Sequence, residues 1–220
     1  MAAVAMSPDL NAEQRLFLHN VTWQTYESLL TLFGDRPLRL TYDRGNLEIM
    51  APSKKHERLG HILGRLIVTL TEELGMGVQG AGSTTFRKEA LVRGLEPDEC
   101  FYLRNEPLIR GRDQYDPHID PPPDLAVEID LSRGPIDRMA IYASLGVPEV
   151  WRFDGTTLQV HLLGSKRTYS VAERSRNFAG LRPQELVRFL KMRSKMDDNQ
   201  VVRAFRRWVH DTFLADGGHA

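Results

Sequence analysis

The sequence lacks several features that would place it in a specialised class of protein. Its one cysteine, Cys100, can form neither an intramolecular disulfide nor a thiolate metal site, which fits a reducing compartment. It has no excess of charge, because 29 Lys and Arg balance 29 Asp and Glu, so any nucleic-acid contact must come from a local patch. A Gly-x-Ser-x-Gly motif is also missing, which leaves nucleophilic hydrolase chemistry without support.

Signals for export or membrane insertion are missing as well. The first residues show no basic segment followed by an apolar core. The most apolar helical stretch, residues 61–74, is too short to cross a bilayer and is interrupted by Arg65, Glu72 and Glu73. With 41% hydrophobic and 26% charged residues the composition is that of a globular protein. We therefore expect a cytoplasmic protein with no membrane partner.

Caps and hydrophobic periodicity predict an α/β (α+β) fold with a mixed sheet and helices on both sides. Thr22 is the expected N-cap of a helix over 22–33, and Ser53 that of a helix over 54–74. Alternating residues predict a hairpin over 38–50. Further strands are expected at 78–87, 96–103, 124–131 and 148–154, a helix at 135–145, a loop at 104–123 and a hairpin at 158–171.

The chain divides by composition into three parts. Residues 1–20 are expected to form a flexible arm, residues 21–180 the main domain, and residues 181–220 a basic helical extension. Within the extension, residues 200–209 present apolar side chains at helical spacing. This pattern favours a packing helix with a solvated basic face over a helix that contacts DNA.

The strand at 124–131 is unusually acidic. Alternation places Leu125, Val127 and Ile129 on one face. The opposite face carries an alanine and three acids, namely Asp124, Ala126, Glu128 and Asp130. Two carboxylates about 4 Å apart repel by about 4 kcal/mol at an effective dielectric near 20. A divalent cation removes this repulsion, and so does exposure to water. This strand alone therefore does not decide between a metal site and a strand with one solvent-exposed face.

A second acidic residue favours the metal interpretation. Asp98 begins the strand at 96–103, and if this strand runs antiparallel to the acidic one, Asp98 lies beside Glu128. Opposite Cβ atoms are about 4.5–5.5 Å apart, close enough to share one ion. Asp124 is about 13 Å from Glu128 along the strand and becomes a groove-end or strand-start residue. Asp98 and Glu128 are the predicted metal ligands, with Asp130 as support.

Further candidates lie earlier in the chain. Glu48 interrupts an apolar hairpin strand and either projects into the groove or faces solvent. His56, Lys54 and Lys55 lie in the first turn of the following helix, where they could contact phosphate or orient water. Lysines near an exposed cap are common, so their specificity is low.

Four segments resemble the bacterial Uma family of restriction-endonuclease-like proteins, which belongs to the PD-(D/E)XK nuclease superfamily and was formerly a domain of unknown function. They read LEIMAPS with HER, EPD, PPDLAVEI and YASLGVPEVW, at residues 47–58, 96–98, 122–129 and 142–151. The resemblance spans roughly residues 22–190. It implies a restriction-endonuclease-like αβββαβ core, preceded here by an N-terminal helix and hairpin and followed by a helical C-terminal tail.

The resemblance also implies a site that hydrolyses phosphodiester bonds in DNA with Mg²⁺ or Mn²⁺. Asp98 takes the place of the Pro-Asp aspartate, Glu128 that of the next acidic residue, and Glu48 that of an additional glutamate. The superfamily lysine belongs where this chain has Asp130, and the lysine that Uma proteins carry on the following helix is replaced by Arg138. Arginine stabilises phosphate charge but cannot act as a base.

Three interpretations remain at this point. The first is a metal-dependent endonuclease in which Asp98, Glu128, Glu48 and Arg138 carry the reaction. The second is a catalytically weakened or inactive nuclease-fold module that binds DNA or a protein partner, which Arg138 favours. The third is an interaction protein whose acidic strand faces water, which the neutral overall charge favours. A homodimer is compatible with the sequence, which does not specify the oligomeric state, target or biological role.

Overall fold

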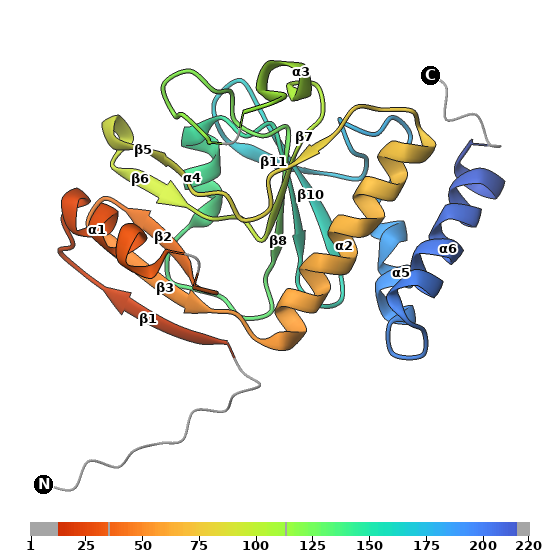
Figure 1. The fold of residues 1–220 in the computed structure, drawn as a ribbon, viewed down its shortest axis with the longest axis horizontal. Coiled ribbons are helices and arrows are strands. Elements are labelled where there is room, and N and C mark those ends of the chain that lie inside the picture. Colours follow the sequence, from red (N-terminus) through yellow and green to blue (C-terminus); the bar gives the residue numbers. More distant parts are fainter. Residues whose placement is uncertain (1–12, 35, 113, 215–220) are drawn as a thin grey trace, which may run out of the picture.

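The computed structural model describes residues 13–34, 36–112 and 114–214, which form two sheets flanked by helices (Figure 1). The first half of the chain builds the whole of one sheet, two strands of the other and the long central helix. Its elements are β1 Gln14–Leu18, α1 Trp23–Phe33, β2 Arg39–Asp43, β3 Asn46–Ala51, α2 Lys54–Glu73, β4 Gln79–Gly80, β5 Phe86–Lys88, η1 Glu89–Leu91, β6 Arg93–Leu95, β7 Glu99–Tyr102 and α3 Glu106–Ile109.

The second half completes the other sheet and adds the C-terminal helices. Its elements are β8 Leu125–Ile129, α4 Arg138–Leu145, β9 Glu149–Phe153, β10 Leu158–Leu163, β11 Tyr169–Ala172, η2 Pro183–Leu186, α5 Val187–Met192, α6 Asp198–Trp208 and the π-helical turn η3 Val209–Leu214. The mixed α+β architecture predicted from the sequence is confirmed.

The larger sheet has the order β11-β10-β9-β8-β7-β4 and is antiparallel except for the β8–β9 pair. One face packs against α2, α5 and α6 through a large core that includes Leu125, Val127 and Ile129. The other face packs against α4, where Ala126 meets Ile141. The alternation expected for β8 is therefore present, but both faces are buried rather than one being wet.

The smaller sheet has the order β1-β3-β2-β6-β5 and is antiparallel throughout, with α1 packed on one face (Figure 1). The Thr22 cap and the hairpin form as predicted, with the Thr22 hydroxyl accepting from the amide of Thr25. Leu95 of β6 joins the α4 core. Helix α4 thus links the two sheets.

Two predictions about local structure are corrected. The arm expected over 1–20 is not loose over its last part, because Gln14–Leu18 pair with β3 along their whole length; residues 1–12 lie outside the described residues. The single strand expected over 78–87 is two short strands in different sheets. Gly82, with a φ of +53°, turns the chain between them, a backbone conformation that glycine adopts without a Cβ penalty.

The C-terminal helices close the core. Asp197 and Gln200 form a capping box at the start of α6, and Phe205 and Trp208 pack towards α2, as the apolar spacing predicted. Cys100 is fully buried in β7 and its thiol donates to the carbonyl of Gly82 at 3.2 Å. In the part of the chain that is described, no helix has the length and apolar character needed to span a membrane.

Candidate active site

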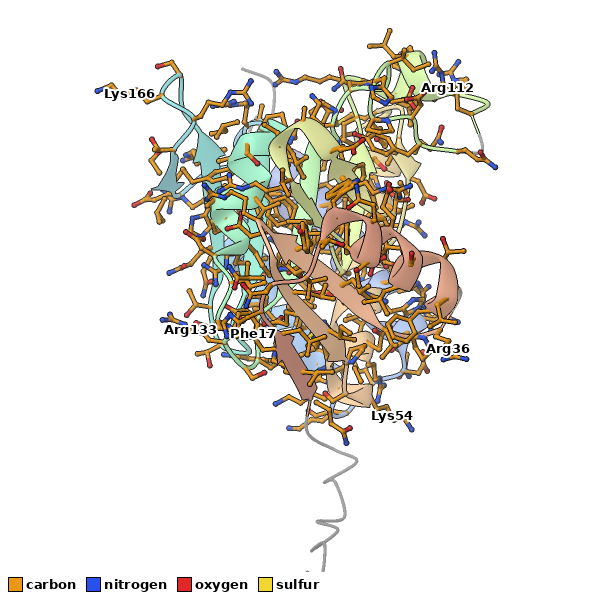
Figure 2. The ribbon with its side chains drawn as sticks, turned by 90° about the vertical axis from the view of Figure 1, so that its left-hand side faces the viewer. Phe17, Arg36, Lys54, Arg112, Arg133 and Lys166 are labelled. Atoms are coloured by element: carbon orange, nitrogen blue, oxygen red, sulfur yellow. The ribbon has the colours of Figure 1, made fainter. Side chains whose placement is uncertain are left out.

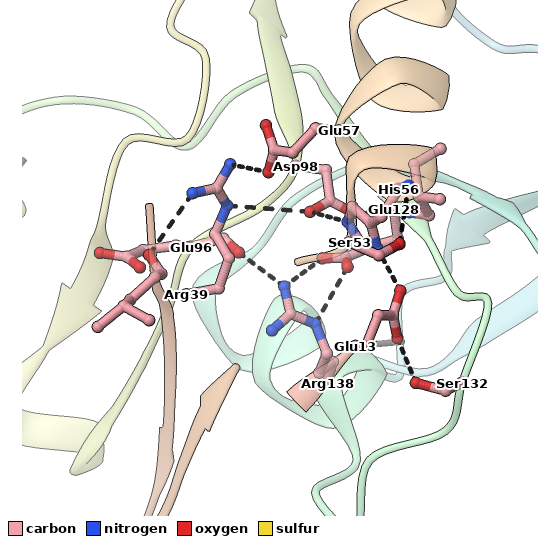
Figure 3. A network of polar contacts seen from close by, with 12 residues as sticks. Glu13, Arg39, Ser53, His56, Glu57, Glu96, Asp98, Glu128, Ser132 and Arg138 are labelled. Carbon is pink, nitrogen blue, oxygen red and sulfur yellow. Dashed lines mark hydrogen bonds and ion pairs between the residues drawn. The ribbon is translucent and has the colours of Figure 1, made fainter. Parts of the chain in front are cut away.

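Asp98 and Glu128 lie side by side where β7 and β8 begin to separate (Figure 3). The register pairs Glu99 with Val127, and the amide of Asp98 donates to the Val127 carbonyl at 3.2 Å. The antiparallel pairing and the neighbouring positions of the two acids therefore agree with the sequence prediction. Asp98 approaches from the α2 side, against Gly60, whereas Glu128 points towards α4.

The Asp98 carboxylate is buried and held from two directions. Its Oδ2 accepts the amide of Ile129 at 2.7 Å, and its Oδ1 accepts from Nε2 of His56 at 2.7 Å. The Nε atom of Arg39 lies 3.9 Å from the same Oδ1. Helix α2 positions His56, because Ser53 caps its N-terminus by accepting from the His56 amide.

His56 bridges two carboxylates. Its Nδ1 lies 2.6 Å from Oε1 of Glu13 and its Nε2 faces Asp98 (Figure 3). Burial lowers the pKa of His56, but the hydrogen bonds and charges of Asp98 and Glu13 outweigh this and raise the pKa to about 9. The imidazole is therefore protonated at neutral pH and donates from both nitrogens.

Glu128 has an arginine as its counter-charge. Arg138, the first residue of α4, donates to it through Nε at 3.1 Å and Nη2 at 2.6 Å, and the Tyr142 hydroxyl donates to the same carboxylate. Burial raises the pKa of Glu128 above its ordinary value, although the charge and hydrogen bonds of Arg138 oppose this shift. Arg138 also donates to the hydroxyl of Thr41 and to the Glu96 carbonyl, so it joins both sheets.

Glu48 stands apart from this pair. Its side chain is 2% exposed and Oε1 accepts from Nη1 of Arg15 at 2.5 Å, while Oε2 is buried without a hydrogen-bond partner. Gly134 covers it so closely that a Cβ at that position would overlap the carboxylate. Within residues 13–34, 36–112 and 114–214, no three His, Cys, Asp or Glu side chains are placed to hold one metal ion. The three-carboxylate cluster predicted from the sequence is therefore not formed there.

The remaining predicted residues have separate positions. Asp124 accepts the amides of Leu103 and Asn105 at 2.8 and 2.9 Å and so serves as a strand-start residue. Asp130 pairs with Arg152. Lys54 is exposed at the start of α2 (Figure 2).

Two cavities flank His56. The first, about 250 Å³, is rich in arginine and reaches Glu128; its lining includes Arg15, His56, Glu128, Asp130, Arg133, Gly134, Asp137, Arg138 and Arg152. The second, about 210 Å³, is the one that Asp98 lines, together with Arg39 and Glu99. Arg133 lies exposed at the surface beside the first cavity (Figure 2). Arginine binds phosphate through paired hydrogen bonds, so the first cavity suits a phosphate-bearing ligand.

The donor chemistry fits a hard divalent ion. Mg²⁺ is typically held by one or two carboxylates, with water and substrate phosphate completing its coordination. Asp98 and Glu128 are therefore ligands of a suitable type and number. Both carboxylates are at present neutralised by protein cations, His56 and Arg138. An ion between them would compete with Arg138 for Glu128, whereas Oδ1 of Asp98 keeps a second lone pair free beside its hydrogen bond to His56.

Sequence reasoning missed several residues of this site. Glu13 and Arg15 were placed in a loose arm, and Tyr142 and Ser132 were not considered. Five residues of β1 give too short a pattern to mark a strand, and their partner strand lies about thirty residues away in the chain. The sequence shows no alternation there, because Leu16, Phe17 and Leu18 are consecutive apolar residues.

An α+β core with paired acids at the point where β7 and β8 separate defines a restriction-endonuclease-like protein. The family model Uma2, described as a putative restriction endonuclease, matches residues 23–191. This is more than half of the chain, and the protein belongs to the Uma2 family. No curated protein matched the sequence.

Proposed function

We propose that the protein is a metal-dependent endonuclease that hydrolyses phosphodiester bonds in DNA. The observation that carries the proposal is the pair formed by Asp98 and Glu128 at the junction of β7 and β8, next to an arginine-lined cavity. Family membership supports the nuclease class. Because the net charge is zero, this local arginine cluster is the feature that would attract a phosphate.

Asp98 and Glu128 would hold Mg²⁺ or Mn²⁺. When bound, such an ion lowers the pKa of a water ligand and polarises a phosphoryl oxygen. Arg133 and Arg152, which line the cavity, would hold the phosphate, and Arg138 would offset charge that develops on it. His56 keeps Asp98 oriented through its Nε2 hydrogen bond. Glu48 would act by fixing Arg15 at the cavity wall.

A second function is favoured by one specific observation. Arg138 and Tyr142 engage both oxygens of Glu128, as in a site that has exchanged a metal ion for an internal ion pair. In that case the protein would be a nuclease-fold module that binds DNA or a protein partner without cleaving it. The arginine-lined cavity serves both functions equally.

Cleavage of supercoiled plasmid with Mg²⁺ or Mn²⁺ tests the first function. Asp98→Asn keeps the size of the side chain and an acceptor for the Ile129 amide, and should lower the cleavage rate by more than about 100-fold. The matched control is Glu173→Ala, an exposed acid beyond β11, which should cleave like the wild type. Equal cleavage by wild type and Asp98→Asn would exclude the enzyme, and DNA binding without cleavage would favour the second function.

A further inference from the structure

The segment before α1 lies outside the residues that the Uma2 model matches, yet it reaches the site. Strand β1 pairs with β3 over its whole length, with Arg15 opposite Met50 and Phe17 opposite Glu48. Alternation along an extended chain puts Glu13 on the same face as Arg15, towards the cavity that Arg15 and Met50 line.

The Glu13 carboxylate is almost completely enclosed, with 3% of its side chain exposed. It accepts from Nδ1 of His56 at 2.6 Å and from the hydroxyl of Ser132 (Figure 3). It also accepts from Nη2 of Arg15 at 3.1 Å. Burial raises the pKa of Glu13, but its hydrogen bonds to His56 and Ser132 lower it to about 2. Glu13 is therefore a buried anion with three donors from three different segments.

These contacts connect Glu13 to Asp98 through one imidazole ring. Nδ1 faces Glu13 and Nε2 faces Asp98, so the carboxylate on one side fixes the direction of the nitrogen on the other. Side chains that orient a metal ligand in this way typically change metal affinity or activity by 10–100-fold when removed. Arg15 makes a parallel connection, because it donates to Glu48 and to the Ser132 carbonyl.

We propose that Glu13 is a positioning residue of the active site: it holds His56 against Asp98, so that β1 completes the site that the family segment begins. This proposal rests on the proposed function, since it assigns Asp98 as a metal ligand. A purely structural role, in which Glu13 only anchors β1, predicts a loss of stability without a specific effect on metal binding or turnover.

The experiment uses full-length Glu13→Gln and Glu13→Ala proteins, with Gln14→Ala as the control because Gln14 is an exposed side chain on the same strand. Mn²⁺ affinity is measured by calorimetry without DNA, kcat and KM by plasmid cleavage, and folding by thermal unfolding. Glu13→Gln keeps an acceptor for His56 and should weaken Mn²⁺ binding and lower kcat by about tenfold, with KM unchanged. Glu13→Ala should have the larger effect, and Gln14→Ala none.

The outcomes separate the two proposals. Wild-type Mn²⁺ affinity in Glu13→Gln overturns the positioning role, whatever the cleavage data show. Weaker Mn²⁺ binding by Glu13→Gln in a protein that shows no Asp98-dependent cleavage supports the positioning role and refutes the nuclease. If Glu13→Ala unfolds, Glu13→Gln decides. A loss of thermal stability in Glu13→Gln that Gln14→Ala does not share, with unchanged Mn²⁺ affinity, leaves only the structural role.

Discussion

The two halves of the site neutralise their carboxylates by different means. Asp98 faces α2 and is paired with His56, whose charge depends on pH and on Glu13. Glu128 faces α4 and is paired with Arg138, which stays charged at any pH the fold would meet. A histidine can release its proton when its partner is lost, whereas an arginine cannot. The charge that faces Asp98 can therefore change with pH, and we call the α2 half adjustable. The charge that faces Glu128 cannot change, and we call the α4 half fixed.

The largest expected effect is the loss of stability when either carboxylate is removed, and it should differ between the two. Glu128→Ala leaves the Arg138 guanidinium buried without its counter-charge and should lower the free energy of unfolding by about 3–5 kcal/mol. Asp98→Ala should cost only about 1–3 kcal/mol, because His56 can become neutral and the main loss is an acceptor for the Ile129 amide. Urea unfolding at pH 7 measures both, and equal losses would contradict the comparison.

The pH dependence of stability tests the adjustable half. The pKa of His56 is raised from 6.5 to about 9, so its stabilising contribution is complete below pH 6.5 and is lost as the pH rises to about 9. The free energy of unfolding should fall by about 3 kcal/mol in the wild type, and this fall should disappear in His56→Gln. Urea unfolding at pH 6.5 and pH 9 measures this difference.

A control is needed for Glu99 in that experiment. Burial and the charge of Asp98 raise the pKa of the Glu99 carboxyl to about 7. Ionising Glu99 is therefore harder in the folded than in the unfolded protein, and the free energy of unfolding falls as the pH rises from about 4.5 to about 7. A Glu99→Gln background removes this overlap. If the free energy of unfolding of the Glu99→Gln protein, with His56 intact, stays constant between pH 6.5 and pH 9, His56 is not held as a cation.

The smallest expected effect concerns the fixed half. Arg138 engages Glu128 through two nitrogens, and Arg138→Lys would replace these with one ammonium group and leave an oxygen free. The rate of metal-dependent plasmid cleavage should then rise by about tenfold, equivalent to about 1.4 kcal/mol in the barrier. Arg152→Lys, in the same cavity, is the control and should show no gain. A faster control, or no change in Arg138→Lys, would contradict the prediction.

Features set by neighbouring residues could be predicted from the sequence. The Ser53 cap and apolar face of α2 mark that helix, and the alternation in β8 places Glu128 opposite the apolar face. The position of Asp98 beside Glu128 needed only the assumption of an antiparallel pair, which the register confirms. Local rules of capping and alternation are sufficient at these places.

Features set by distant partners could not be predicted in this way. Glu13 depends on a pairing between β1 and β3 and on a loop at Ser132, more than a hundred residues away. The separation of Glu48 from the acidic pair depends on Gly134, whose missing Cβ lets the loop cover the carboxylate. The double contact of Arg138 with Glu128 depends on a rotamer, which no sequence pattern specifies.

The burial of Cys100 has a practical consequence for studying this protein. Its thiol is enclosed in β7, and burial raises its pKa, so the reactive thiolate is scarce at neutral pH. Because it is the one cysteine in the sequence, a second cysteine introduced on the surface would take up a maleimide dye almost alone. Fluorescent probes can therefore be attached beside the cavity without first removing the native thiol.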